Sequence, residues 1–310
     1  MASEILIWII FSVFIIGMLG VDLTYHHRNQ RVIGYKEALV WSAAWIVLAL
    51  LFCVGLFFTR GSEAAFNFLS GYLIEKALSI DNLFVFLIIF SYFSTPPQYV
   101  HKVLFWGVVG AFAMRALFLF TGLIVIHLFH WVIYLFGIYL IITGIQLGSG
   151  KSQGFDPGKN PVIKLLQKWM PITNEYHGNK FFIFKEKRRW ATPLFVVLIV
   201  IETTDILFAL DSAPAILAIT TDPFIVYTSN IFAILGLRAL YFVLADAMRA
   251  FAYLHYGLAA LLILIGLKML LSNYIQVPPA IALGIMAIVL AVSVIASLFS
   301  RTSNLDKKNK

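Results

Sequence analysis

Long apolar runs separated by short polar breaks dominate the chain. A helix needs about 20 apolar residues to cross the ~30 Å hydrocarbon core of a bilayer, and most of these runs reach that length. The pattern predicts an all-α membrane protein with about nine transmembrane helices. The predicted spans cover residues 5–24, 37–58, 65–93, 100–126, 128–149, 191–217, 224–245, 252–273 and 277–299. Because only four residues separate the fourth span from the fifth, a re-entrant pair is the alternative there.

Charged residues interrupt the third predicted span near its middle. Glu75, Lys76 and Asp81 lie there, followed by Asn82. Insertion scales put the cost of one charge at the bilayer centre at about 2.5–3.5 kcal/mol, so each charge needs a partner, a water-filled cavity or a ligand. In a regular helix Glu75, Ser79 and Asn82 share one face, whereas Asp81 lies about 120° away from Glu75.

The sixth predicted span carries a second acidic cluster. Glu202 and Asp205 share a helix face, and Asp211 points to the other side. Pro214 cannot donate to the carbonyl of Leu210, so a kink is expected there, with that carbonyl free as a ligand. For both clusters two alternatives stay open at this point: the helices are locally unwound, or the outlying aspartates face separate partners.

A competing interpretation is that the acids only form internal ion pairs. Five acids in the predicted spans face four cations there: Lys76, Arg115, Arg238 and Lys268. We expect incomplete neutralisation, because Lys268 can extend toward a membrane edge and Lys76 leaves the helix on a different face from Glu75. Arg115 and Arg238 are expected to hold carboxylates in place.

The two halves of the chain resemble each other. The segment 110–117 is similar to 233–240, the segment 142–147 is similar to 264–269, and both halves carry acids in their first helix. Spans 3–5 and 6–8 are therefore predicted to be copies. Three helices per copy make the second copy enter the membrane in the opposite sense, an inverted repeat of the kind found in many secondary transporters.

The polar stretch 150–190 separates the two halves. Residues 162–169 alternate at helical spacing and end on a Trp, which predicts a short helix on the membrane surface. An ordinary solvated loop is the alternative. No polar stretch is long enough for a second domain, so we predict one membrane domain over residues 1–310.

Composition agrees with a membrane protein, and charge placement predicts its orientation. The chain is 61% hydrophobic and 12% charged, against about 25% charged residues in soluble domains. The predicted loops on one side, with the C-terminal tail, hold 18 of the 23 Lys and Arg residues, and the opposite loops hold only Arg60. This places the N-terminus outside, with 150–190 and the C-terminus in the cytoplasm. The basic excess thus indicates topology and contact with anionic lipid, not nucleic acid.

The N-terminal apolar run and the single cysteine indicate no further functional site. The apolar run that follows Glu4 lacks a basic n-region, so it is predicted to be a membrane helix and not a cleaved signal. Cys53 is the single cysteine, which allows neither an intrachain disulfide nor a thiolate metal cage.

The candidate ligands are all oxygen atoms. Carboxylates, an amide and hydroxyls suit Mn²⁺, Ca²⁺ or Mg²⁺, whereas copper, nickel and zinc would recruit His or Cys. None of the seven histidines lies within either acidic cluster. No resident cofactor is expected, since the metal would be the substrate.

Two long motifs resemble the TerC/Alx family of integral membrane proteins. Residues 72–82 match its first signature and 201–215 its second, while 220–224 and 228–238 are most similar to the Alx branch. The resemblance covers the chain from span 2 through span 9. It implies a manganese exporter of the bacterial inner membrane and a set of metal-binding residues: Glu75, Asp81, Asn82, Glu202, Asp205 and Asp211.

Three function classes follow from these observations. The first is a transporter that exports a hard divalent cation, most of all Mn²⁺, in exchange for protons. The second is an intramembrane aspartyl protease, which the absence of a Gly-x-Gly-Asp motif disfavours, so no enzyme is expected. The third is a non-transporting or metal-delivering partner that helps insert or metallate exported proteins together with the secretion machinery.

Overall fold

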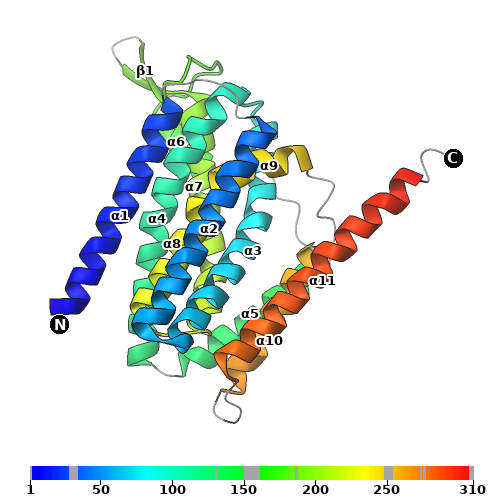
Figure 1. Cartoon of the computed structure of the whole chain (residues 1–310). Helices are drawn as coiled ribbons and strands as arrows, with labels where there is room; N and C mark the ends of the chain where they lie inside the picture. Colours follow the sequence, from blue (N-terminus) through cyan, green and yellow to red (C-terminus); the bar gives the residue numbers. More distant parts are fainter. Residues whose placement is uncertain are drawn as a thin grey trace.

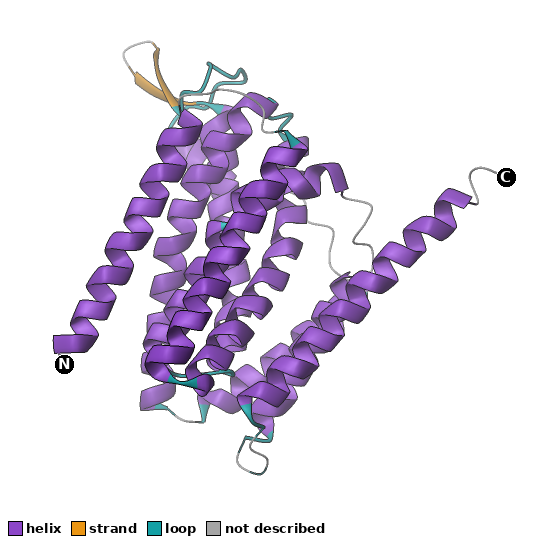
Figure 2. Ribbon diagram, viewed as in Figure 1, coloured by secondary structure: helices purple, strands orange, loops and turns teal. Residues whose placement is uncertain are grey.

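The computed structural model describes residues 2–27, 34–129, 131–149, 161–185, 188–247, 254–272, 274 and 277–306. Within these residues the chain forms a bundle of long helices with a small hairpin at one end (Figures 1 and 2). The elements are α1 (Ala2–His27), α2 (Tyr35–Arg60), α3 (Ser62–Tyr92), α4 (Pro97–Leu128), α5 (Val132–Gly148), α6 (Pro161–Trp169), β1 (Phe182–Lys185), β2 (Arg188–Ala191), α7 (Pro193–Leu217), α8 (Pro223–Leu235), α9 (Leu237–Ala247), α10 (Leu254–Leu270) and α11 (Pro279–Asp306).

Several helices are long and apolar enough to cross a membrane. Among the described residues four helices meet that requirement, namely α2, α4, α7 and residues Pro279–Ser297 of α11, and the bent pair α8 and α9 makes a fifth span if counted as one. The apolar helices α5 and α10 have 17 residues each, and α3 has 31 residues with ionisable groups near its middle. The protein is therefore a multi-pass membrane protein. Every predicted span overlaps a helix, and the total of nine spans remains a prediction.

The seventh predicted span is broken, which the sequence did not lead us to expect. Two helices, α8 and α9, meet at Gly236 with a bend of 40°. The Nζ of Lys76 donates a hydrogen bond of 3.1 Å to the carbonyl of Ala233, in the last turn of α8. A cation suits the negative end of the helix dipole, so Lys76 stabilises a helix end that would otherwise leave a carbonyl unsatisfied.

Both acidic clusters lie within unbroken helices. The helix α3 is continuous from Ser62 to Tyr92, and α7 continues through Pro214 to Leu217. Local unwinding, one of the two open alternatives, is therefore not what the structure adopts. Pro214 lies in the last turn of α7, where its missing N–H removes one hydrogen bond without ending the helix.

The region between the two halves corrects the all-α prediction. Two strands, β1 and β2, pair antiparallel with Phe182 opposite Ala191. The predicted short helix is present as α6, but its inner face packs on the bundle: Ile163 and Leu166 contact the core, while Leu165 and Trp169 are exposed. Contact of α6 with lipid stays a prediction.

The bundle has two distinct ends. At the hairpin end, the hydroxyl of Tyr176 donates a 2.9 Å hydrogen bond to the carbonyl of Phe93, which joins the loop before β1 to the end of α3. At the opposite end, which we call the Gly61 end, Arg60 pairs with Asp222 across 3.3 Å. Figure 1 shows the hairpin at the top and the Gly61 end at the bottom.

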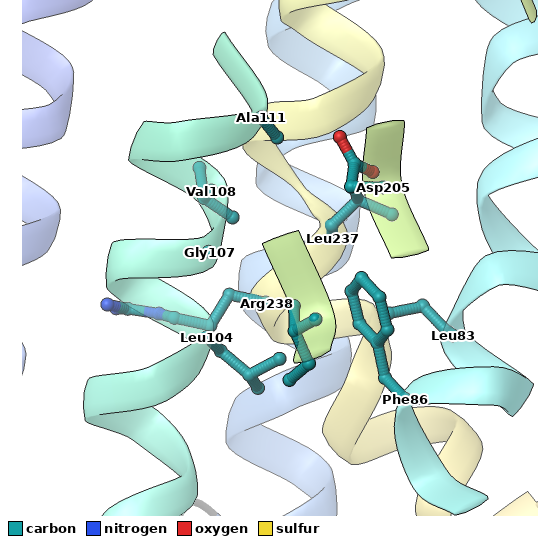
Figure 3. Close-up of a pocket in the computed structure, with 10 residues that line it drawn as sticks. Leu83, Phe86, Leu104, Gly107, Val108, Ala111, Asp205, Leu237 and Arg238 are labelled. Atoms are coloured by element: carbon teal, nitrogen blue, oxygen red, sulfur yellow. The ribbon is translucent and has the colours of Figure 1, made fainter. Parts of the chain in front are cut away.

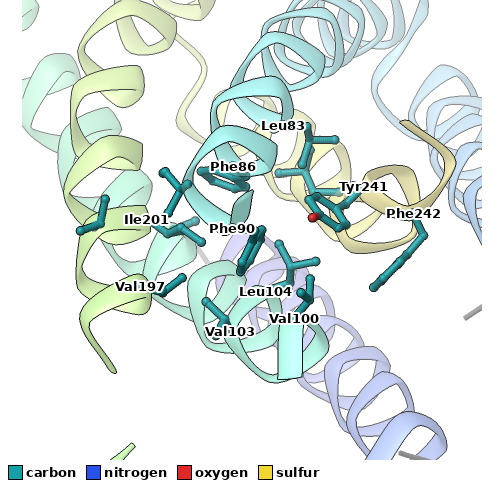
Figure 4. Packing of buried hydrophobic residues seen from close by; sticks show 14 of the residues in the cluster. Leu83, Phe86, Phe90, Val100, Val103, Leu104, Val197, Ile201, Tyr241 and Phe242 are labelled. Carbon is teal, nitrogen blue, oxygen red and sulfur yellow. The ribbon is translucent and has the colours of Figure 1, made fainter. Parts of the chain in front are cut away.

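The interior is apolar toward the hairpin end. The largest buried cluster lies there and draws on α3, α4, α7 and α9 (Figure 4). Its labelled members include Phe86, Phe90, Leu104, Val197 and Ile201. We call this cluster the apolar plug, because it fills the centre of the bundle between the hairpin end and the middle of α3.

Helix neighbours follow a crosswise pattern. The helix α3 packs mainly against α8, α7 mainly against α4, and α5 against α10. The last pair is very close: a Cβ at Gly266 would lie 2.6 Å from the carbonyl oxygen of Gly137, and a Cβ at Gly144 would lie 2.8 Å from that of Ala259. Small residues at such positions let membrane helices approach backbone to backbone.

Candidate functional site

Arg115 joins the two acidic clusters in the middle of the bundle. It lies on α4, and its guanidinium contacts the carboxylate of Glu75 on α3 through Nη1. Its Nη2 lies 3.4 Å from Oδ1 of Asp205 on α7. All three residues are buried, with exposed fractions of 2%, 1% and 3% for Arg115, Glu75 and Asp205. Residues 40 and 90 positions away in the sequence thus meet at one cation, and the predicted role of Arg115 as a carboxylate holder is confirmed.

The two carboxylates keep acceptor capacity after pairing with Arg115. Within the described residues, Oε2 of Glu75 and Oδ2 of Asp205 accept no hydrogen bond. A buried acceptor without a partner costs about 1–3 kcal/mol, more for a charged group. Such oxygens are therefore well suited to bind an additional cation or proton.

Glu202 lies one helical turn before Asp205 on α7. Its carboxylate occupies the space that a Cβ at position 110 of α4 would take, so a larger residue than Gly110 would displace this carboxylate. Glu202 forms no ion pair with the residues that the structure describes. It therefore adds a third carboxyl group, one helical turn from Asp205, that has no cation partner among the described residues.

The other predicted ligands are placed only in part. Asn82 is buried on α3, two turns beyond Glu75. Asp81 and Asp211 lie within α3 and α7, but their side chains fall outside the described residues. No group of three or more His, Cys, Asp or Glu side chains poised for a metal is found among the side chains that are described. The complete six-residue metal site therefore stays a prediction.

A small cavity borders Asp205. It lies between α3, α4, α7 and α9, has a volume of about 10 Å³ and is lined by Asp205 and Arg238 among apolar residues (Figure 3). That volume is close to the space needed for one water molecule. In Figure 3 the side chain of Arg238 extends away from Asp205. Of the two arginines that the repeat predicts to be equivalent, Arg115 pairs with Asp205, whereas Arg238 lines the same cavity as Asp205 but points away from it.

The two lysines in the predicted spans bind backbone carbonyls. Lys76 donates to Ala233, on a different face of α3 from Glu75, and Lys268 donates over 3.2 Å to Ala218 at the C-terminus of α7. We expected both lysines to stay apart from the acids, and these contacts agree with that. Glu75 and Asp205 are instead paired with Arg115.

Sequence reasoning missed a polar residue on α8. Asn230 is buried, and its Nδ2 donates no hydrogen bond to the described part of the chain. The signal was present as three consecutive polar residues, Thr228, Ser229 and Asn230, within an apolar span. Thr228 and Ser229 donate back to carbonyls of their own helix, but Asn230 does not. An amide in the membrane interior with a free donor belongs among the candidate functional groups.

Comparison with known proteins identifies a family. The profile described as "Integral membrane protein TerC family" matches residues 60–305. A membrane protein of Myxococcus xanthus named "Uncharacterized membrane protein STKORF319" is 47% identical over 292 residues, which cover 94% of this chain and 92% of that protein. Proteins named "Putative membrane-bound redox modulator Alx" are 43% identical in Photorhabdus laumondii (95% of each chain) and 42% identical in Escherichia coli K12 (94% of this chain, 93% of that one). No solved structure shows a significant match.

Proposed function

Because the chain belongs to the TerC family of integral membrane proteins, we propose that it exports a hard divalent cation, most of all Mn²⁺, in exchange for protons. The observation that carries this proposal is the meeting of Glu75 and Asp205 at Arg115, in the buried middle of the bundle. Ionisable groups inside a membrane bundle mark ion paths and proton relays. Carboxylates can release a metal ion when they take up protons, so exchange for protons follows from the same groups.

The charge balance supports a divalent substrate. Glu75 and Asp205 meet at Arg115, and Glu202 lies one helical turn before Asp205. The predicted site adds Asp81, Asp211 and the amide of Asn82. We propose that these six residues, Arg115 excluded, bind the ion. Their oxygen ligands match Mn²⁺, with Ca²⁺ or Mg²⁺ as possible substrates of the same chemistry.

The crosswise packing supports an inverted repeat. Exchange of α3 with α7, of α4 with the pair α8–α9, and of α5 with α10 maps the α3–α8 contact onto α4–α7. It also maps the approach of Gly137 to Gly266 onto that of Ala259 to Gly144, because position 137 corresponds to 259, and 144 to 266, with the same offset of 122 positions. We propose that the halves, spans 3–5 and 6–8, form such a repeat and alternate access around the Arg115 group.

Metal selectivity tests the proposed function. We expect cells that lack their other manganese efflux systems to tolerate more manganese when they express this protein, with copper and zinc tolerance unchanged, because the ligands are hard oxygen atoms. Growth at graded metal concentrations measures this, and flux of Mn²⁺ into liposomes that hold the purified protein confirms it directly. Equal protection against copper or zinc would contradict the proposed ligand set.

We also propose the orientation given by the cation distribution, in the bacterial inner membrane. It puts the Gly61 end outside and the hairpin end, with the C-terminus, in the cytoplasm. Cysteines introduced at Ser152 or Ser303 are then expected to resist an impermeant thiol reagent added to intact cells, and to react after the cells are opened. Reaction of both cysteines in intact cells would show that the orientation, and with it the direction of transport, is opposite to the one proposed.

A metal-delivering partner of the secretion machinery is the alternative, since it would use the same acids. This alternative requires the secretion machinery for metal movement. Purified protein in liposomes lacks that machinery, so the alternative predicts no Mn²⁺ flux there. The relatives named as redox modulators raise a further question about thiol chemistry. Cys53 is the single cysteine here, so an intrachain disulfide is not available.

A further inference from the structure

A short segment of irregular backbone crosses the hairpin end of the bundle. Residues 171–181, which we call the strap, run between α6 and β1. Three side chains of the strap, Ile172, Tyr176 and Phe181, pack against the apolar plug. The strap therefore covers the buried centre of the bundle at this end.

Hydrogen bonds join both ends of the strap to the start of α7, in the second half of the chain. The carbonyl of Pro171 accepts from the N–H of Ala191, and the N–H of Thr173 donates to the carbonyl of Ala191, each over 2.9 Å. At the other end of the strap, the hydroxyl of Thr192 donates over 2.7 Å to the carbonyl of Lys180. Ala191 and Thr192 are fully buried and immediately precede α7. The strap is therefore fixed to the second half.

Side chains join the same strap to the first half of the chain, where α3 ends and α4 begins. The hydroxyl of Tyr176, which donates to the carbonyl of Phe93, also lies 3.2 Å from the hydroxyl of Thr95. Burial raises the pKa of the Tyr176 phenol, so this hydroxyl keeps its proton and can donate. From α4, the Nζ of Lys102 donates to the carbonyl of Asn179. The strap thus connects two parts of the chain that belong to different halves.

The apolar plug, on which the strap packs, is likewise shared between the halves. Val103 on α4 and Val197 on α7 are both fully buried in it (Figure 4). Access to the Arg115 group from the hairpin end therefore requires that α3 and α4 move away from α7. Because the strap is fixed to the start of α7, this movement has to break the contacts that Tyr176 and Lys102 make across the strap.

We propose that the strap is the latch of a gate at the hairpin end. The contacts of Tyr176 and Lys102 hold the two halves together over the apolar plug, and their release opens the way from this end to the Arg115 group. Each neutral hydrogen bond contributes only modestly to stability, so a latch made of a few such bonds can hold the gate and still release it in every cycle. This inference rests on the proposed transport function, since alternating access requires a gate at each end.

Labelling of a buried cysteine measures how often the gate opens. In a Cys53→Ala background, Val197→Cys is treated with an impermeant thiol reagent in membrane vesicles whose hairpin end faces the reagent. Tyr176→Phe keeps the aromatic ring and removes only the hydroxyl, and Lys102→Met keeps an unbranched side chain and removes the ammonium. We expect the two substitutions together to raise the labelling rate about tenfold or more, because the rate follows the open population and two hydrogen bonds of the closed state are lost. Tyr176→Phe alone is the more conservative variant and is expected to change the rate less, in the same direction.

Two controls separate release of the latch from general loosening of the protein. Gln98→Cys, exposed at the start of α4, identifies the vesicles whose hairpin end faces the reagent and is expected to react equally with and without the substitutions in the strap contacts. Tyr227→Phe removes a hydroxyl from α8 near the Gly61 end and is expected to leave the labelling of Val197→Cys unchanged. An unchanged rate in the double variant, or an equal increase with Tyr227→Phe, would overturn the latch.

The transport function is measured separately, as Mn²⁺ flux through the Cys53→Ala protein in liposomes. Absence of that flux would contradict the transport function, whereas the labelling rates report on the latch without depending on flux. Size-exclusion chromatography confirms that each variant compared is folded. Val103→Cys repeats the measurement from α4, so that the result does not depend on one reporter position.

Discussion

Replacing Arg115 by Gln is expected to remove most of the folded protein from the membrane. The substitution leaves Glu75 and Asp205 buried without their shared cation. Breaking a buried pair from one side costs about 3–5 kcal/mol, a large part of the ~5–15 kcal/mol by which folded proteins are usually stable. Size-exclusion chromatography of solubilised membranes, together with thermal melting, measures the loss.

The double role of Arg115 gives this experiment its controls. Arg60→Gln removes the ion pair with Asp222, which is partly exposed, so its expected cost is only ~0–1 kcal/mol. The triple variant Arg115→Gln, Glu75→Gln, Asp205→Asn removes the stranded charges and is expected to recover part of the yield. A normal yield and melting temperature for Arg115→Gln alone would show that the two acids do not depend on this arginine.

Removal of single charges from the proposed site is expected to abolish transport and leave folding intact. Glu202→Gln, Asp81→Asn and Asp211→Asn each keep shape and polarity but delete one negative charge. Attraction for a divalent ion in a low-dielectric site falls steeply with each lost charge. Glu202 forms no ion pair with Arg115 in the described structure, so Glu202→Gln leaves the pairs of Arg115 with Glu75 and Asp205 in place.

The readout is Mn²⁺ flux in liposomes, normalised to the amount of folded protein. Glu63→Gln is the matched control, since Glu63 lies exposed in the first turn of α3 and is expected to leave flux unchanged. Normal flux in Asp81→Asn and Asp211→Asn together would mean that the aspartates serve only in structural ion pairs. The competing interpretation, that the acids only form ion pairs inside the protein, would then be correct.

The helices, the family and the central charges could be predicted from the sequence. Apolar runs of membrane length are a strong signal, and a charge inside such a run has few roles available to it. The sequence also predicted that Glu75 and Asp205 lie inside membrane-spanning helices. What the sequence could not supply was the tertiary fact that one arginine binds both, because residues so far apart in sequence have no periodic relation.

The features that escaped prediction depend on tertiary contacts. The hairpin β1–β2 is only four residues per strand, which is too short for alternation to stand out from a polar loop. The bend at Gly236 depends on the lysine of another helix, Lys76. Asn230 could have been noticed as an amide in an apolar run, but its lack of a partner becomes visible only after packing.

The bend between α8 and α9 gives the two halves different mechanical properties. The helix α4, which corresponds to this pair in the proposed repeat, is one uninterrupted helix of 32 residues. The α8–α9 pair instead has a joint at Gly236, and the ammonium of Lys76 donates a hydrogen bond to Ala233, three residues before that joint. Lys76 directly follows Glu75 in α3, so neighbouring residues of one helix contact the joint and the Arg115 group.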